Sequence, residues 1–333
     1  PNPSPAEIAK AADKAAKHYL AYFKKQNSKS YDDVCTEYIT DFSATYDAHT
    51  KYLDSEFFST FQNSVLHAPK AEVEDDISKK PDAARAFSKV LEIDGAKYAY
   101  LRLSAFYGAD KRDDGALGRS SAEDLARELD TLRGAGALGL LFDLRSNGGG
   151  GLDDAVKTIA LFVRSGPAVR MAGVGGDITI PVAEDAVHWD RPIVVLVDRG
   201  SASAGELVPA TLQDTARAVI VGDEHTFGKG TAQTIIPIDG GKNGALAVTE
   251  SRFYRITGAS TQFKGVQPDI VLRSIERNYA YAGERALPYA MEWDECDATP
   301  FDKSWDMDKF IPALAKASEE RRDASKTWKE YGE

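Results

Sequence analysis

A serine at a strand-to-helix corner is the first candidate for chemistry. The apolar run 193–197 (IVVLV) has the length and composition of a strand that is buried on both faces, as in parallel sheets. Small residues follow it up to Ser203, and the residues after that have the apolar pattern of a helix. The amides at the start of a helix can stabilise an oxyanion that forms beside such a serine. We therefore interpret Ser203 as a nucleophile.

A lysine between two glycines is the candidate base. Lys229 follows a second apolar run, 218–221, and Phe227 lies two positions before it. An amine with the ordinary lysine pKa of about 10.4 is protonated at neutral pH, so it can accept a proton from serine only when burial lowers that pKa. Gln233 can accept a hydrogen bond from this amine without adding a negative charge, which would raise the pKa again. Pairs of serine and lysine are a known variant of the catalytic triad.

A histidine makes a different hydrolase an alternative. His225 lies between Ser203 and Lys229 in the sequence, so a serine–histidine–acid triad can be imagined. The GxSxG pattern of many such hydrolases is not met, because Ser201 occupies the first glycine position. No histidine follows His225, so the acid would have to be one of three residues, Asp214, Asp223 or Glu224.

Five motifs of the chain resemble those of the C-terminal processing peptidases, the tail-specific proteases of peptidase family S41. They are DLRSNGGG at 143–150, SASAGE at 201–206, TLQDTARAVIVG at 211–222, TFGKGTAQ at 226–233 and FYRITGASTQFKGVQPDIVL at 253–272. The resemblance covers nearly the whole chain. It implies an α/β fold with a ClpP/crotonase-like protease core, and a serine endopeptidase that enters its protein substrates from an apolar C-terminal tail.

The resemblance also assigns roles to single residues. The family's serine nucleophile falls on Ser203, its lysine base on Lys229, and the glutamine that orients the lysine on Gln233. Its oxyanion donors fall on main-chain amides, namely that of Ala204 and one of the pair Gly148 and Gly149. A catalytically idle peptide-binding scaffold of the same fold is a further alternative, and it is disfavoured because the serine, the lysine and the glutamine are all present.

The glycine run 148–151 does not have the character of a phosphate site. It has neither the GxGxxG pattern nor a GK[ST] ending. Asp153 and Asp154 fall in the first turn of the helix expected at 152–163, where two carboxylates would repel a phosphate. We therefore expect the glycine amides to approach a substrate carbonyl.

The composition excludes several classes of function. The 333 residues carry a formal net charge of -11, which would repel a nucleic-acid backbone. The sequence has no run of about 18 apolar residues, so we expect no transmembrane segment. The histidines and cysteines have no metal-ligand spacing, so we expect no metal or other cofactor. We expect Cys35 and Cys296 to be two buried thiols, with a disulfide between them as the less favoured alternative.

Apolar periodicity predicts the elements around these residues. Helical spacing predicts helices at 5–25, 31–46, 53–66 and 120–133. Alternating runs on both sides of Asp94-Gly95 predict a hairpin. Further strands are expected at 138–142, 218–221 and 246–254.

We expect four regions along the chain: an N-terminal helical region at 1–66, a linker at 67–89, the α/β protease core at 90–285 and a C-terminal helical region at 286–333. In the resembled peptidases a PDZ domain occupies the place of the linker, and a stretch this short cannot encode a domain. The charged helix expected at 307–331 should pack beside the N-terminal helices.

The resemblance implies partners and a compartment. Substrates would be unfolded proteins or proteins with an exposed tail, and an adaptor protein would be a further partner. Members of the family mostly work outside the cytoplasm, in the bacterial periplasm, which implies a periplasmic or otherwise extracytoplasmic location. The chain begins with Pro1 and shows no signal peptide, so this location follows from the resemblance alone.

Overall fold

The protein is described from a computed structural model, which covers residues 3–66, 86–108, 119–182, 187–273, 283–303 and 305–332, without the side chains of 61–66 and 331–332. A linker was predicted at 67–89. Its positions 67–85 lie outside the described residues, and so does the predicted lack of a PDZ domain there. Residues 87–89 belong to the first strand of the core, so the core begins slightly earlier than predicted.

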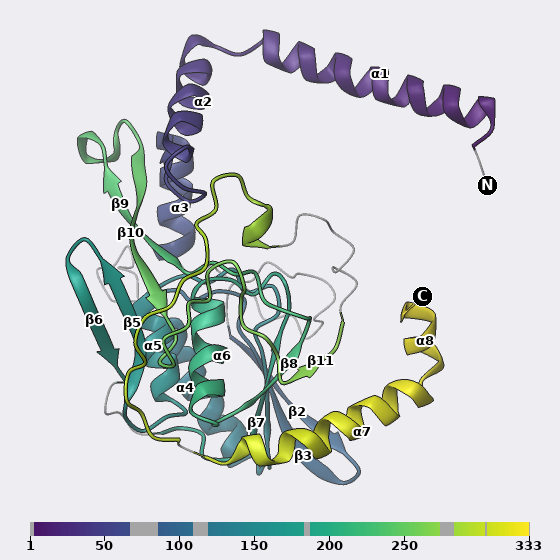
Figure 1. Ribbon diagram of the computed structural model, residues 1–333, viewed down its shortest axis with the longest axis vertical. Helices are drawn as coiled ribbons and strands as arrows, with labels where there is room; N and C mark the ends of the chain where they lie inside the picture. The colour runs from purple at the N-terminus through teal and green to yellow at the C-terminus, as the bar shows by residue number, and fades with distance from the viewer. Residues whose placement is uncertain are drawn as a thin grey trace.

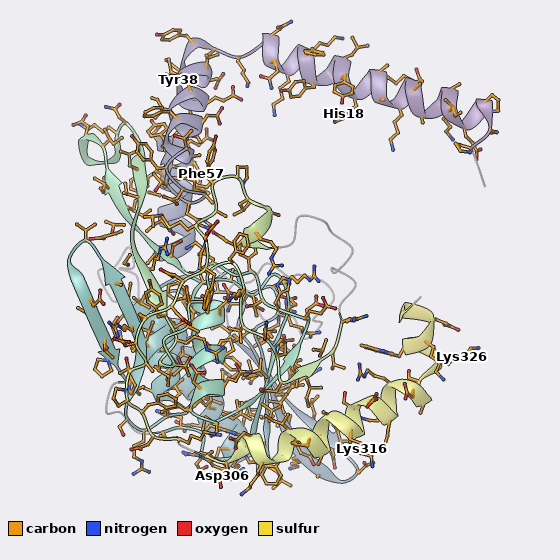
Figure 2. All side chains as sticks on the ribbon, viewed as in Figure 1. His18, Tyr38, Phe57, Asp306, Lys316 and Lys326 are labelled. Atoms are coloured by element: carbon orange, nitrogen blue, oxygen red, sulfur yellow. The ribbon has the colours of Figure 1, made fainter. Side chains whose placement is uncertain are left out.

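Three helices lead into the core, as predicted. Their bounds, with those of the short strand between the second and third, are α1 Pro5–Asn27, α2 Tyr31–Ala44, β1 Lys51–Leu53 and α3 Ser55–Leu66. Capping boxes begin the first two helices, because Ser4 and Ser30 each bond reciprocally with an acid three positions later. Helix α1 has no buried residue and extends away from the core (Figure 1). Figure 2 shows His18 on α1 and Tyr38 on α2 away from the core.

A six-stranded sheet forms the centre of the core. Its strand order is β11-β8-β7-β4-β3-β2, and all pairs are parallel except β2 with β3. The bounds are β2 Phe87–Ile93, β3 Ala96–Arg102, β4 Leu140–Asp143, β7 Ile193–Val197, β8 Val219–Gly222 and β11 Ile270–Val271. The predicted hairpin at Asp94-Gly95 joins β2 to β3, which confirms that prediction.

Three helices cross between the parallel strands and lie between this sheet and a second one (Figure 1). Their bounds are α4 Ser121–Gly134, α5 Leu152–Ala160 and α6 Ala204–Asp214. They share a dry core with the sheet that includes Leu129, Phe142, Ile159 and Val195, each fully buried. The burial of these side chains is the largest favourable contribution to the fold, at about 25 cal/mol for each Å² removed from water.

The second sheet is antiparallel, and most of it was not predicted. Its strand order is β1-β10-β5-β6, with β9 on the other side of β10. The bounds are β5 Pro167–Gly173, β6 Gly176–Pro181, β9 Thr231–Pro237 and β10 Ala245–Tyr254. Only β10 was expected from the sequence. The turn Val174-Gly175 between β5 and β6 lacks the Asn-Gly or Asp-Gly pair that marks a hairpin most clearly.

The C-terminal region corrects one prediction. The described residues include the 3-10 helices Glu284–Ala286 and Met307–Phe310 here and a further one at Asp239–Gly241 between β9 and β10, and the α-helices α7 Ile311–Ala324 and α8 Lys326–Gly332 end the described chain. A single helix beside the N-terminal helices was expected, and both parts of that expectation are wrong. Helix α7 packs on β11, and Figure 1 shows it at the opposite end of the molecule from α1 and α2.

The reason lies in the central strand β7. Its residues alternate, so Ile193, Val195 and Val197 face the core helices while Val194 and Leu196 face the other side of the sheet. That second face must be covered, and α7 covers it together with Met307 and Trp305. None of the helices in the described ranges is both long and apolar enough to cross a membrane.

Candidate active site

Ser203 lies at the corner between β7 and α6, as predicted. Its backbone has φ 55° and ψ -119°, a conformation that glycine adopts readily and other residues rarely. Such a conformation costs about 1–3 kcal/mol and persists only where the surroundings impose it. Here the Ser203 amide donates to Glu206 Oε2 at 2.8 Å, and the preceding Ala202 amide donates to Asn147 O at 2.9 Å. The serine is thus held at the carboxyl edge of the parallel sheet.

The serine loop is joined to the loop that leaves the neighbouring strand β4. Ser146 N donates to Asp198 Oδ1 at 2.8 Å, and Ser201 Oγ donates to Leu144 O at 2.8 Å. Because β4 and β7 are adjacent and parallel, both loops leave the same edge of the sheet. The glycine run therefore lies beside the serine although about fifty residues separate them in the chain.

The glycines of this run differ in what they do. Gly149 has φ 102°, and a Cβ there would lie 2.8 Å from Ser203 Cβ, so only glycine allows this close approach. The Gly149 amide already donates to Asn147 Oδ1 at 2.9 Å. Among the described residues, the amides of Gly148 and Ala204 have no hydrogen-bond partner, so both are available to an oxyanion.

Lys229 has the environment that a basic amine requires. Its Nζ donates to Thr231 O and to Gln233 Oε1, each at 2.7 Å. Burial lowers the pKa of Lys229 to about 8, against the opposing effect of nearby carboxylates, those of Glu284, Glu206 and Asp47. At pH 7 about a tenth of the amine is then neutral. Within the part of the chain that the structure describes, the amine makes these two hydrogen bonds and none to Ser203 Oγ.

Gln233 presents its carbonyl end to the lysine. Its Nε2 donates to Thr231 Oγ1 and to Thr249 Oγ1, each at 3.0 Å, so Oε1 is left for the Lys229 amine. A neutral amine has two N–H groups and one lone pair. Since Thr231 O and Gln233 Oε1 accept the two N–H groups, the lone pair is the one part of the neutral amine left to take a proton.

Glu206 connects the loops of Ser203 and Lys229, and the sequence reasoning missed it. Its side chain is fully buried and its two oxygens accept four hydrogen bonds, from Ser203 N (2.8 Å), Lys229 N (2.8 Å), Gly228 N (2.7 Å) and Thr226 Oγ1 (2.5 Å). Burial raises the pKa of Glu206 to about 7, although each of these bonds acts in the opposite direction. An acid three positions after the corner serine was the available signal, because an acid there can turn back to cap the helix.

His225 is not joined to the serine. Its Nδ1 lies 2.7 Å from Thr226 O, and no hydrogen bond links its ring to Ser203 in the described ranges. The alternative triad would take its acid from one of three residues, and all three form ion pairs with arginines. Asp214 pairs with Arg255, and Asp223 and Glu224 pair with Arg199. In the same ranges no three His, Cys, Asp or Glu side chains gather as metal ligands would. In the described residues no acid is hydrogen-bonded to His225, as a serine–histidine–acid triad would require.

Comparisons with known proteins support the family resemblance that these motifs indicate. Residues 97–272 match the model of peptidase family S41, and residues 277–333 match the C-terminal domain of tail specific protease. A tail-specific protease of Haemophilus influenzae is 34% identical over 244 residues, which are 71% of this chain and 32% of that protein. A carboxy-terminal-processing protease of Bartonella bacilliformis is 34% identical over 208 residues, 58% of this chain and 44% of that protein. The chain thus spans a third to under half of the length of these relatives.

A lipoprotein of Streptococcus agalactiae of known structure is similar in fold, with a TM-score of 0.53, 15% sequence identity, and coverage of 75% of this chain and 80% of that one. The predicted fold class, an α/β core of the ClpP/crotonase type with helical segments before and after it, is confirmed. Because the family model covers more than half of the sequence, the chain belongs to peptidase family S41.

Proposed function

We propose that the chain is a serine endopeptidase that uses Ser203 as nucleophile and Lys229 as base. One observation carries this proposal: the main-chain amides of both residues donate to the same oxygen, Glu206 Oε2. The nucleophile loop and the base loop are thereby fixed to each other. The amine of Lys229 also has a pKa near 8, within reach of physiological pH.

The reaction then follows the acyl-enzyme route. Ser203 Oγ attacks the peptide carbonyl while Lys229 Nζ takes the hydroxyl proton, and the ammonium later protonates the leaving amine. The resulting ester is hydrolysed by water, which Lys229 activates in the same way. The Ala204 amide and that of Gly148 or Gly149 stabilise the oxyanion of each tetrahedral intermediate. Gly149 can serve only after its amide leaves Asn147 Oδ1.

The substrate class comes from the relatives, whose names describe tail-specific and carboxy-terminal-processing proteases. We infer that the substrates are unfolded proteins or proteins with an exposed apolar C-terminal tail, in the periplasm or another extracytoplasmic compartment. An adaptor protein that delivers such substrates is a further partner in this proposal. The segment between α3 and β2 is too short for a PDZ domain, so cleavage should depend only weakly on the sequence of the tail.

Two measurements test the function. The purified chain is incubated with an unfolded protein, and separately with a fluorophosphonate that labels activated serines. We expect cleavage and labelling at Ser203, and neither in Ser203→Ala. A folded chain that cleaves nothing and takes up no label would instead support the idle scaffold. The dependence on the tail is tested by comparing cleavage rates of one substrate that carries either an apolar or a charged C-terminal tail. A preference for the apolar tail above about a hundredfold, or ~2.7 kcal/mol, would contradict weak dependence on the tail sequence.

A further inference from the structure

A buried acid of the N-terminal region is connected to the candidate base. Asp47 lies between α2 and β1 and is 4% exposed. Its Oδ1 accepts hydrogen bonds from His49 N (2.8 Å), Thr50 N (3.0 Å) and Thr249 Oγ1 (2.8 Å), and its Oδ2 accepts one from Thr50 Oγ1. Asp47 precedes the residues 97–272 that match the family model.

The antiparallel sheet brings this acid to the site. Strand β1 pairs with β10, which places the 47–50 turn beside Thr249. Strand β10 pairs with β9 on its other side, where Thr249 lies directly opposite Gln233. Side chains of directly opposed residues project from the same face of a sheet, so the threonine hydroxyl reaches the glutamine carboxamide. A continuous path of hydrogen bonds results, from Lys229 through Gln233 and Thr249 to Asp47.

The negative charge of Asp47 determines which group donates and which accepts in each hydrogen bond between Asp47 and Gln233. Asp47 accepts four hydrogen bonds, which outweigh the effect of burial and hold its pKa below the ordinary value, so its oxygens only accept. Thr249 has a single hydroxyl proton and donates it to Asp47. Its oxygen must therefore accept from Gln233, which turns the NH₂ end of the carboxamide to the threonine and the oxygen to Lys229.

The opposite orientation would disable the base. With the carboxamide reversed, its NH₂ group would face Lys229 and donate to the amine lone pair, which the reaction needs for the serine proton. Thr231 Oγ1, the other partner of Gln233 Nε2, is a hydroxyl and can donate as well as accept, so it does not by itself select one orientation.

A second path fixes the same turn against the loop of the base. His49 Nε2 lies 2.8 Å from Glu284 Oε2, Glu284 Oε1 accepts from Gln262 Nε2 at 2.8 Å, and Gln262 Oε1 accepts from Gly230 N at 2.7 Å. Three nearby carboxylates raise the pKa of the Lys229 amine, those of Glu284, Glu206 and Asp47, and the amine of Lys51 lowers it.

We propose that Asp47 and Thr249 are positioning residues, which fix the Gln233 carboxamide so that its oxygen faces Lys229. This proposal rests on the proposed function in one respect, that Lys229 is the base. The region before the family core is then part of the catalytic apparatus through this path, although neither residue touches the substrate.

The test compares two substitutions of one side chain in the full chain. Thr249→Val removes the hydroxyl at nearly constant shape, and Thr249→Ser retains it. We expect Thr249→Val to lower kcat on an unfolded protein by about tenfold or more with KM nearly unchanged, because a general base contributes factors of ~10² to 10⁴. Thr249→Ser should restore kcat to within a few-fold of the starting chain.

The pKa of Lys229 is a second readout, and it does not depend on turnover. It distinguishes a change in the orientation of Gln233 from a general loosening of the site. Competitive acetylation with acetic anhydride at a series of pH values, followed by peptide mass spectrometry, measures the pKa of Lys229 directly. Loss of the accepting oxygen of Gln233 disfavours the ammonium, so Thr249→Val should lower this pKa further while Thr249→Ser leaves it near 8. Mere loosening would admit water and raise it toward the ordinary value.

Asp47→Asn gives an independent check. The asparagine oxygen can still accept from Thr249, so the orientation of Gln233 persists while the negative charge is lost. We expect the pKa of Lys229 to fall, because the charge of Asp47 raises it. A rise in this pKa in Thr249→Val, no change in either readout, or equal failure of Thr249→Ser would overturn the proposal. A starting chain without peptidase activity whose Lys229 pKa shifts as expected would refute the proposed function alone.

Discussion

The main-chain amides of Ser203 and Lys229 donate to one and the same oxygen, Glu206 Oε2, at 2.8 Å each. The other oxygen of this carboxylate holds Gly228 N and Thr226 Oγ1 in the base loop. A single buried acid therefore joins the loop after β7 to the loop before β9. The strained backbone of Ser203 is maintained by a contact that also fixes the distance to the base.

Glu206→Gln should separate the two loops. A carboxamide has one accepting oxygen and one NH₂ group, so at least one main-chain N–H would face another donor. We expect a loss of about 2–4 kcal/mol in the free energy of unfolding, measured by denaturant titration, and activity at least about a hundredfold lower. Glu320→Gln, an exposed acid on α7, is the matched control and should change neither. Full activity in Glu206→Gln would show that the shared carboxylate is dispensable.

Activity should rise from pH 6 and level off above about pH 8, because Lys229 must lose its proton and Glu206, with a pKa of about 7, must be ionised to hold the two loops. Burial lowers the pKa of Lys229 to about 8, and only the neutral amine can accept the serine proton, so the rate falls below that pH and levels off above it. The measurement is kcat/KM on one unfolded substrate from pH 6 to 10. A profile that is already flat at pH 7 would point to a base with the lower pKa of a histidine.

Gln233→Glu should move that profile to higher pH. A carboxylate 2.7 Å from the amine in place of the carboxamide oxygen would favour the ammonium and raise the pKa of Lys229 by about one unit or more. Activity at pH 7 should then fall by about tenfold and recover in part at pH 9. Gln267→Glu, an exposed position with the same change of charge, serves as control and should leave the profile in place. An unshifted profile in Gln233→Glu would remove Gln233 from its orienting role.

The parts of the site that follow one strand directly could be predicted from the sequence. Ser203 follows β7 and the glycine run follows β4, and each local pattern of apolar strand, small residues and helix is strong by itself. The antiparallel sheet was largely missed, because β9 carries polar residues such as Thr231 and Gln233 where a buried strand would carry apolar ones. The polar residues of β9 therefore serve contacts within the candidate active site and do not follow the pattern of burial in the core.

Long-range contacts were beyond the sequence for a different reason. Asp47 and Thr249 are about 200 residues apart, and only the pairing of β1 with β10 brings them together. The C-terminal helix was placed wrongly because the sequence of a charged helix does not show which apolar surface it will cover. Glu206 was missed since an acid beside a helix start is an ordinary cap, and its burial under two loops becomes evident only in three dimensions.

The most direct test of the account compares two single substitutions, Lys229→Ala and His225→Ala, by kcat/KM on the same unfolded protein at pH 8. Removal of the base should lower turnover by at least about a hundredfold. The proposed mechanism gives His225 no part in proton transfer, and its Nδ1 lies 2.7 Å from Thr226 O, so His225→Ala should keep most of the activity. An inactive His225→Ala together with an active Lys229→Ala would contradict the serine–lysine mechanism.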